Sequence, residues 1–131
     1  MINKEELRIG NLVLSNGKVW RVSAIDDGCV TVENTQRPYN KLVTINDEVF
    51  PILLTNVTIG ACADFGLDSR YKVTKVFGRF DFFDDALTVR SLKRVQTWHE
   101  VQNLFYALTG RELQVLAVIK TLMKVKKADS G

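Results

Sequence analysis

The residues able to do metal or acid–base chemistry are few and scattered along this chain. His99 is its one histidine, and its two cysteines, Cys29 and Cys62, stand far apart. These counts exclude a paired-histidine site such as HExxH and a zinc site of four cysteines or of two cysteines and two histidines. His99 stands in the first turn of a predicted helix, where the helix dipole disfavours a charged imidazolium. We therefore expect a packing or surface role for His99, with a base or ligand role as the alternative.

Three acidic pairs offer the carboxylates that general acid–base catalysis would need. They are Asp26-Asp27, Asp47-Glu48 and Asp84-Asp85, and each stands where a turn is predicted. Aspartate favours turns because it hydrogen-bonds its own backbone, whereas catalytic carboxylates need surroundings that separate their pKa values. A cation site at Asp81, Asp84 and Asp85 is the weaker alternative. Since no glycine-rich phosphate loop is found either, we expect no enzyme activity, no metal and no cofactor; a small hydrolase is the least favoured alternative.

Basic and aromatic residues interleave in the second half of the chain, a pattern typical of nucleic-acid-binding surfaces. Aromatic rings stack on bases, and lysine and arginine side chains follow the phosphate backbone. The interleaved aromatics are Tyr71, Phe77, Phe80 and Phe82. The candidate nucleic-acid-binding residues are Arg70, Lys72, Lys75, Arg79, Arg90, Lys93, Arg94, Lys124, Lys126 and Lys127. The alternative is a half-buried sheet with its aromatics inward and its charges outward, which needs no ligand.

The small net charge of this 131-residue chain, +3, hides an uneven distribution. Residues 1–68 hold six Lys/Arg and nine Asp/Glu, whereas residues 69–131 hold twelve Lys/Arg and six Asp/Glu. Such an asymmetry indicates either a surface that meets nucleic acid or an acidic protein, or two faces that attract each other. The composition, 46% hydrophobic and 25% charged, excludes wholesale disorder. The length predicts a single domain over residues 1–131.

Short strands on tight turns are predicted for residues 1–55. Asn16-Gly17 is the strongest hairpin signal, because both central residues of a type I′ turn take positive φ. The expected strand segments are Leu12–Leu14, Val19–Val22, Cys29–Val32, Lys41–Ile45 and Val49–Leu54. The connections expected between the later segments are Asp26-Asp27-Gly28, Asn34–Asn40 and Asn46-Asp47-Glu48. Five such strands favour a small SH3-like β-barrel, since closure removes exposed edges.

Residues 56–131 are predicted to hold a short helix, a β-hairpin or three-stranded meander, and one or two C-terminal helices. Thr55 is expected to cap the short helix and Gly66 to end it in a left-handed conformation. Alternation of apolar and polar residues then predicts strands at Tyr71–Phe77, Arg79–Phe83 and Ala86–Leu92. The whole chain is therefore expected to be an α+β protein.

The most regular helical pattern begins at Thr97, whose spacing from Glu100 is that of a capping box. Behind it, Val101, Leu104, Phe105 and Leu108 form one apolar stripe. A second capping pattern at Thr109-Gly110-Arg111-Glu112 precedes a further helix, and a strand over residues 113–127 is the alternative. Trp20, Val22 and Ala24 are expected on one face of their strand. The expected core residues are Trp20, Val22, Phe50, Leu53, Leu104, Phe105 and Leu108.

Four blocks of the chain together resemble a known protein family. The blocks are Glu5–Val13 (EELRIGNLV), Pro51–Thr55 (PILLT), Phe65-Gly66 and Val101–Leu113 (VQNLFYALTGREL). They resemble a family of small bacterial proteins of gut anaerobes, often carried on phage or other mobile elements. The chain departs from the family pattern at Asn56–Ala61 (NVTIGA), where relatives place a Trp-Leu-Leu helix. The resemblance implies a genomic setting and no particular activity.

Targeting signals are the last feature of the sequence that bears on function. Residues 1–8 lack the apolar core of a signal peptide, and no apolar stretch reaches the ~20 residues needed to cross a bilayer. We therefore expect a cytoplasmic protein with free thiols and no membrane contact. The function expected is that of a non-enzymatic accessory protein of a mobile element that binds nucleic acid. The alternative is a protein-interaction module or a homodimer.

Overall fold

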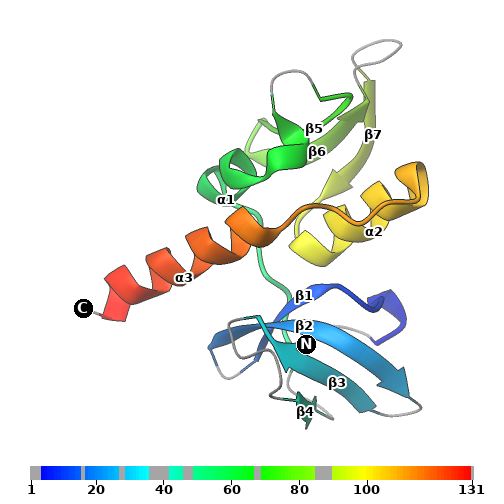
Figure 1. The fold of residues 1–131 in the computed structure, drawn as a ribbon. Coiled ribbons are helices and arrows are strands. Elements are labelled where there is room, and N and C mark those ends of the chain that lie inside the picture. The colour runs from blue at the N-terminus through cyan, green and yellow to red at the C-terminus, as the bar shows by residue number, and fades with distance from the viewer. Residues whose placement is uncertain are drawn as a thin grey trace. The chain divides into compact units, whose positions relative to one another are not determined.

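The computed structural model describes residues 4–15, 17–26, 29–35, 42–45, 49–66, 69–84 and 90–130, and it is an α+β protein (Figure 1). The strands are β1 (Leu12–Ser15), β2 (Lys18–Asp26), β3 (Cys29–Asn34), β4 (Leu42–Ile45), β5 (Tyr71–Val76), β6 (Arg79–Asp84) and β7 (Arg90–Val95). The α-helices are α1 (Asn56–Ala61), α2 (Trp98–Thr109) and α3 (Leu116–Ser130), and the 3-10 helices are η1 (Lys4–Glu6) and η2 (Ala63–Phe65).

The chain divides into two compact units, each made of two stretches of sequence. Unit 1 comprises Met1–Ile52 and Thr97–Glu112, and unit 2 comprises Leu53–Gln96 and Leu113–Gly131. Helix α2, which the sequence interpretation grouped with the C-terminal part, therefore belongs with the N-terminal strands.

Unit 1 contains a four-stranded antiparallel sheet with the order β1-β2-β3-β4. The predicted hairpin between the first two strands is confirmed, because Ser15 pairs with Lys18 and only two residues connect them. Gly17 has φ 71°, the left-handed conformation that glycine adopts without steric cost. Its neighbour Asn16 lies outside the described residues.

Within unit 1, the expected fifth strand, Val49–Leu54, is represented by an isolated bridge at Phe50. Phe50 pairs antiparallel with Leu14 through two backbone hydrogen bonds of 2.9 and 2.8 Å, on the edge of β1 that β2 leaves open. Among the described residues no pairing closes the sheet between β4 and this segment, so the SH3-like barrel stays a prediction.

The core of unit 1 lies on one face of this sheet. Its buried members are Leu7, Val13, Trp20, Val22, Val30, Val32 and Val49. A β-bulge between Val22 and Ala24 shifts the register of β2 against β3. The expectation that Ala24 shares a face with Val22 is therefore wrong: an inserted residue reverses the alternation, and Ile25 packs against the core instead.

Helix α2 packs beside β1 and is held there by polar side chains. Gln102 accepts a hydrogen bond from the Leu12 amide at 2.8 Å and donates one to the Gly10 carbonyl at 3.0 Å. Asn103 accepts from the Asn11 side chain at 2.8 Å, and the Arg8 guanidinium pairs with the Glu112 carboxylate. Two of the sequence blocks that carry the family resemblance thus meet in unit 1.

The ends of α2 depart from the expected capping pattern in one respect. Thr97 is the N-cap, as expected, but its hydroxyl makes no capping bond and instead donates to Glu100 Oε1 at 2.8 Å. The expected capping box is therefore wrong. Gly110 ends the helix in the left-handed conformation. Thr109 is the last residue of α2, so the second capping pattern predicted at Thr109 does not begin the next helix. That helix, α3, starts at Leu116, and residues 116–127 are therefore helical and do not form the alternative strand.

Unit 2 contains a three-stranded antiparallel meander, β5-β6-β7, which confirms that expectation. On one face of this sheet the buried residues are Tyr71, Val73, Phe82 and Val95. Phe82 contacts the ring of Tyr71 at 5.6 Å between centroids and meets Phe65 of η2 edge-on at 6.0 Å. Part of the core of unit 2 therefore lies between this face and η2.

The two α-helices of unit 2 pack against each other. Thr55 caps α1 in a reciprocal capping box with Thr58, both bonds being 3.2 Å, so the expected cap is confirmed. Gly66 has φ −67°, so the expected left-handed stop there is wrong; α1 has already ended at Ala61 in an extended Cys62. Cys62 is a buried free thiol that donates to the Gln114 carbonyl at 3.6 Å, and burial raises its pKa to about 11.

Three of the expected core residues are exposed, namely Phe50, Leu53 and Leu108, and Leu104 is half-buried. In the segment around Pro51 the inward residues are Val49, Ile52 and Leu54. In α2 the buried stripe is Trp98, Val101, Gln102 and Phe105, because the polar Gln102 turns inward to bond the β1 segment. Trp20, Val22 and Phe105 are buried as expected.

Some sequence expectations lie outside the described residues. They are Asp27-Gly28, residues 36–41, Asn46-Asp47-Glu48 and residues 85–89. In the described part of the chain, every helix is too short or too polar to cross a membrane.

Candidate nucleic-acid interface

The outer face of the β5–β6–β7 sheet gathers some of the basic residues that the sequence singled out. Strand register places Lys72 opposite Phe83, Asp81 opposite both Thr74 and Arg94, and Arg79 opposite Val76. Opposed residues of an antiparallel pair project from the same face, and successive residues of a strand from opposite faces. Since Val73 and Phe82 point into the core, these side chains belong to the other face, and none of them is buried.

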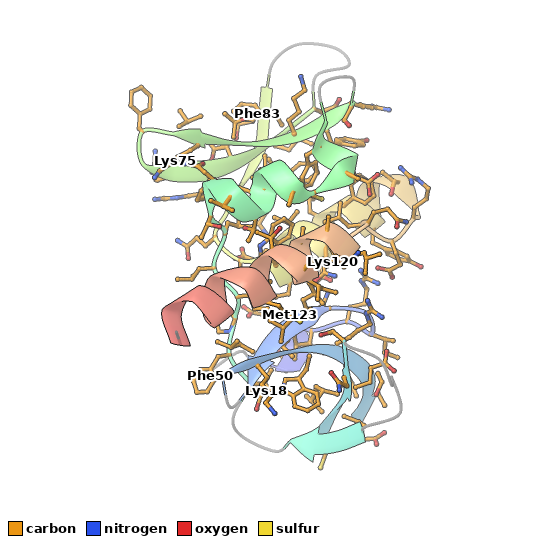
Figure 2. The ribbon with its side chains drawn as sticks, turned by 60° about the vertical axis from the view of Figure 1, so that its left-hand side comes forward. Lys18, Phe50, Lys75, Phe83, Lys120 and Met123 are labelled. Carbon is orange, nitrogen blue, oxygen red and sulfur yellow. The ribbon has the colours of Figure 1, made fainter. Side chains whose placement is uncertain are left out.

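We call this surface the outer face, defined by Lys72, Thr74, Val76, Arg79, Asp81, Phe83, Ser91 and Arg94. It carries three cationic side chains and one carboxylate, Asp81. Phe83 is the half-buried aromatic residue of the surface, and Figure 2 shows it on the side of the sheet away from α1. An aromatic ring that shares a sheet face with three cations gives that face the composition of a surface that stacks a base and contacts phosphates.

Other predicted site residues have different surroundings. Arg70 donates two hydrogen bonds of 3.1 Å to the Asp84 carboxylate, which raises the pKa of the guanidinium. Lys75 pairs with Phe80 and projects from the same face of the sheet as Val73 and Phe82. Its ammonium lies 5.9 Å from the centre of the Phe80 ring. Lys93 is exposed and opposes the core residue Phe82.

The remaining predicted residues are described by their backbone alone. Arg90 pairs with Asp84 in the sheet, and Lys124, Lys126 and Lys127 lie in α3. Their side chains lie outside the described part of the structure.

The tip of the β5–β6 hairpin is a feature that sequence reasoning missed. Alternation grouped Phe77 with Tyr71 and Val73, but the strand ends at Val76 and Phe77 forms the turn with Gly78. Both turn residues have positive φ, 50° and 79°, as in a type I′ hairpin, and Phe77 is 94% exposed. The sequence signal for this turn is Gly78, which directly follows Phe77 and stands between two alternating segments.

His99 is buried in unit 1, only 3% exposed, and contacts two polar groups. Its Nδ1 lies 3.1 Å from the Thr97 hydroxyl, and its Nε2 lies 3.7 Å from Glu6 Oε2. Burial lowers the pKa of His99 below its usual range, although the nearby carboxylates of Glu100 and Glu6 oppose that shift. His99 therefore packs as a neutral side chain near pH 7, in line with the packing role expected for it.

The described residues bring together no group of three or more His, Cys, Asp or Glu side chains that could hold a metal ion. Asp84 is engaged with Arg70, and Asp81 lies on the outer face between Thr74 and Arg94. The third member of the acidic cluster considered from the sequence, Asp85, lies outside the described residues.

The lowered pKa of His99 predicts a pH dependence of stability. In the unfolded chain His99 binds a proton with a pKa near 6.5, whereas in the folded chain its pKa is lower. The free energy of unfolding therefore has its full value above about pH 6.5 and decreases as the pH falls below it. The slope is at most about 1.4 kcal/mol per pH unit for this one group. Urea unfolding of the wild type and of His99→Gln between pH 5.5 and 7.5 measures it. Equal slopes in the two proteins would contradict the assignment.

No protein-family model, curated protein or solved structure matches this chain. The arrangement of its own residues is therefore the basis for the function proposed below.

Proposed function

We propose that this protein is a binding module without enzymatic activity, and that the outer face binds nucleic acid. The observation that carries the proposal is that the two faces of one sheet differ: one packs into the core, and the other carries basic side chains that are not buried. The inner face packs into the core through Tyr71, Val73, Phe82 and Val95, although Lys75 and Lys93 of the same register are exposed. The outer face presents Lys72 opposite Phe83, Arg94 opposite Asp81 and Arg79 farther along β6, with none of them buried.

The charge of the two units supports the proposal. Unit 1 holds seven Lys/Arg and nine Asp/Glu, whereas unit 2 holds eleven Lys/Arg and six Asp/Glu, giving −2 and +5. A basic unit attracts a polyanion and raises the rate of encounter with it. The positive charge therefore belongs to the same unit as the outer face.

The chemistry of binding follows from the types of side chain present. Arg79 and Arg94 donate hydrogen bonds to phosphate oxygens, which positions the strand without reading its sequence. Phe83 offers a ring on which a base stacks, and stacking is tolerant of base identity. Asp81 opposes Arg94 and offsets part of the positive charge. The expected behaviour is therefore binding with strong salt dependence and little sequence preference.

Salt titration with single-charge variants tests this proposal. We expect wild-type binding to an oligonucleotide to weaken steeply between about 50 and 200 mM salt, because counterions are released from each neutralised phosphate. Arg79→Gln and Arg94→Gln should each weaken binding at low salt and reduce the salt slope by about one. Fluorescence anisotropy of a labelled oligonucleotide measures both quantities.

Two matched controls remove one charge elsewhere. Lys18 of β2 and Lys120 of α3 are exposed, and Figure 2 labels both. Lys18→Gln and Lys120→Gln are expected to leave the salt slope within error of the wild type. A flat salt dependence of the wild type, no binding at about 50 mM salt, or equal losses in all four variants would refute the outer face as the binding surface.

The biological setting is a further part of the proposal. The resemblance of residues 5–113 to proteins carried on phage and mobile elements supports an accessory role in the cytoplasm, where such elements meet nucleic acid. The genes that neighbour this one in its genome test that setting: a cluster of phage or conjugation genes is expected, and housekeeping neighbours would count against it.

The finer fold of unit 1 also belongs here. The strand order β1-β2-β3-β4, with Phe50 bridged to the open edge of β1, supports an SH3-like arrangement of five strands. In this proposal unit 1 is the scaffold that carries α2, and unit 2 carries the binding surface.

A further inference from the structure

Phe77, at the tip of the β5–β6 hairpin, is the most exposed large hydrophobic side chain among the described residues. It is 94% exposed, and the next in order, Leu53, is 65% exposed. A hairpin tip is where a polar residue is ordinarily found, and an aromatic ring in water forgoes the burial that stabilises it. Packing within the chain therefore does not account for this phenylalanine.

The backbone does not account for it either. Phe77 has φ 50°, the left-handed region that bulky residues adopt only with strain. The first central position of a type I′ turn favours asparagine, aspartate or glycine, and the second is already Gly78. Asparagine at position 77 would serve the hairpin better than phenylalanine does. A residue that suits neither the core nor the turn has its use outside the chain.

The charges beside the tip indicate what it meets. Residues 72–80 contain Lys72, Lys75 and Arg79 and no acidic residue. Lys75 and Arg79 stand two residues before and two residues after Phe77, and both are exposed. Figure 2 labels Lys75 on the strand that leads to this tip. An apolar ring with cations on both sides complements a nucleobase with phosphates on both sides.

We propose that Phe77 stacks on a nucleobase while Lys75 and Arg79 contact the flanking phosphates. The inference rests on the proposed function and adds a second kind of contact to it. The outer face supplies salt-dependent attraction, and the tip supplies stacking that salt does not screen. The base is either unpaired in a single strand or unstacked from a duplex step by the ring, and the stacking chemistry is common to both.

Phe77→Asn is the decisive variant, because it removes the ring and places Asn-Gly, the preferred type I′ pair, in the turn. Its fold should be at least as stable as that of the wild type, so lost binding cannot be attributed to unfolding. We expect affinity for an oligonucleotide to fall about tenfold at every salt concentration, with an unchanged salt slope, because stacking carries no counterion release. Phe77→Trp should retain wild-type affinity.

A fluorescent base analogue, 2-aminopurine, placed at each position of a single strand and of the matching duplex reports stacking directly. A change in its emission with the wild type and with Phe77→Trp, absent with Phe77→Asn, supports the inference. A response in the single strand alone identifies an unpaired base, and a response in the duplex identifies insertion between pairs. Both outcomes support stacking by Phe77.

Two results would overturn the inference, and they differ in what they leave standing. In the first, Phe77→Asn binds the oligonucleotide and changes the 2-aminopurine emission as the wild type does, while Arg79→Gln and Arg94→Gln still weaken binding. The stacking role of Phe77 then fails and the proposed function survives. If the wild type binds no oligonucleotide and sediments as a dimer that Phe77→Asn converts to monomer, the tip contacts a second copy of this chain and both proposals fail.

Discussion

Replacing Phe82 with alanine is expected to lower the free energy of unfolding of unit 2 by about 3–5 kcal/mol, the usual cost of removing a buried ring. Phe82 is 0% exposed and is the centre of the aromatic contacts with Tyr71 and Phe65. We expect the neighbours to close little of the space that the ring leaves, because Phe82 is paired on both sides, with Val73 of β5 and Lys93 of β7. The loss of transfer free energy and the remaining cavity therefore add together.

Denaturant unfolding followed by circular dichroism measures this effect, and the adjacent residue provides its control. Phe83 is the same residue type on the same strand but lies on the outer face and is half-buried. Phe83→Ala should cost less than Phe82→Ala, since less buried area is lost from a half-buried ring than from a fully buried one. The two variants should also separate in function: Phe83→Ala is expected to bind nucleic acid more weakly while folded. Equal destabilisation by both variants would contradict the assignment of the two faces.

Gln102→Met is expected to cost unit 1 about 2–4 kcal/mol, because two backbone groups would lose their partner in a buried place. Gln102 is 1% exposed, and its amide bonds the Leu12 N–H and the Gly10 carbonyl at 2.8 and 3.0 Å. Methionine has a similar length and is apolar, so it fills the space without satisfying either group. The cost is the desolvation of the orphaned groups and not a cavity.

Hydrogen exchange offers a site-specific readout of that prediction. The Leu12 amide should exchange faster in Gln102→Met than in the wild type, in addition to the change in the unfolding midpoint. Gln114→Met is the control: its side chain is exposed, while its backbone amide bonds Asp64 and its carbonyl accepts from Cys62, so both contacts remain. It should change stability by less than about 0.5 kcal/mol. Unchanged exchange at Leu12 would show that the glutamine bridge is dispensable.

Local sequence signals predicted the elements that depend on neighbouring residues. Asn16-Gly17 predicted a two-residue hairpin, Thr55 predicted the cap of α1, and the alternation from Tyr71 predicted β5. These signals work because a positive φ, a capping hydroxyl and a strand period are properties of a few consecutive residues. They also identified Lys72, Arg79 and Arg94 as candidates for a binding surface.

The errors arose where a distant partner decided the outcome. The apolar stripe expected in α2 ran through Leu104 and Leu108, but the helix turns Gln102 inward to bond the backbone of residues 10 and 12. No local signal shows that those backbone groups lie there. Ala24 was misplaced because a bulge reverses the alternation after Val22, and a bulge is defined by its pairing strand.

By itself, the sequence determined the α+β composition, the number and type of most elements, and the concentration of positive charge in the second half of the chain. Only the tertiary structure decided that α2 belongs with β1, that the sheet of unit 2 has a core face and an outer face, and that Phe77 is a turn residue 94% exposed. The physical reason is that period and composition state which residues can share a face, whereas burial depends on which face another element covers. The candidate interface is therefore a product of packing: strand β6 supplies Phe82 to the core and Phe83 to the outer face.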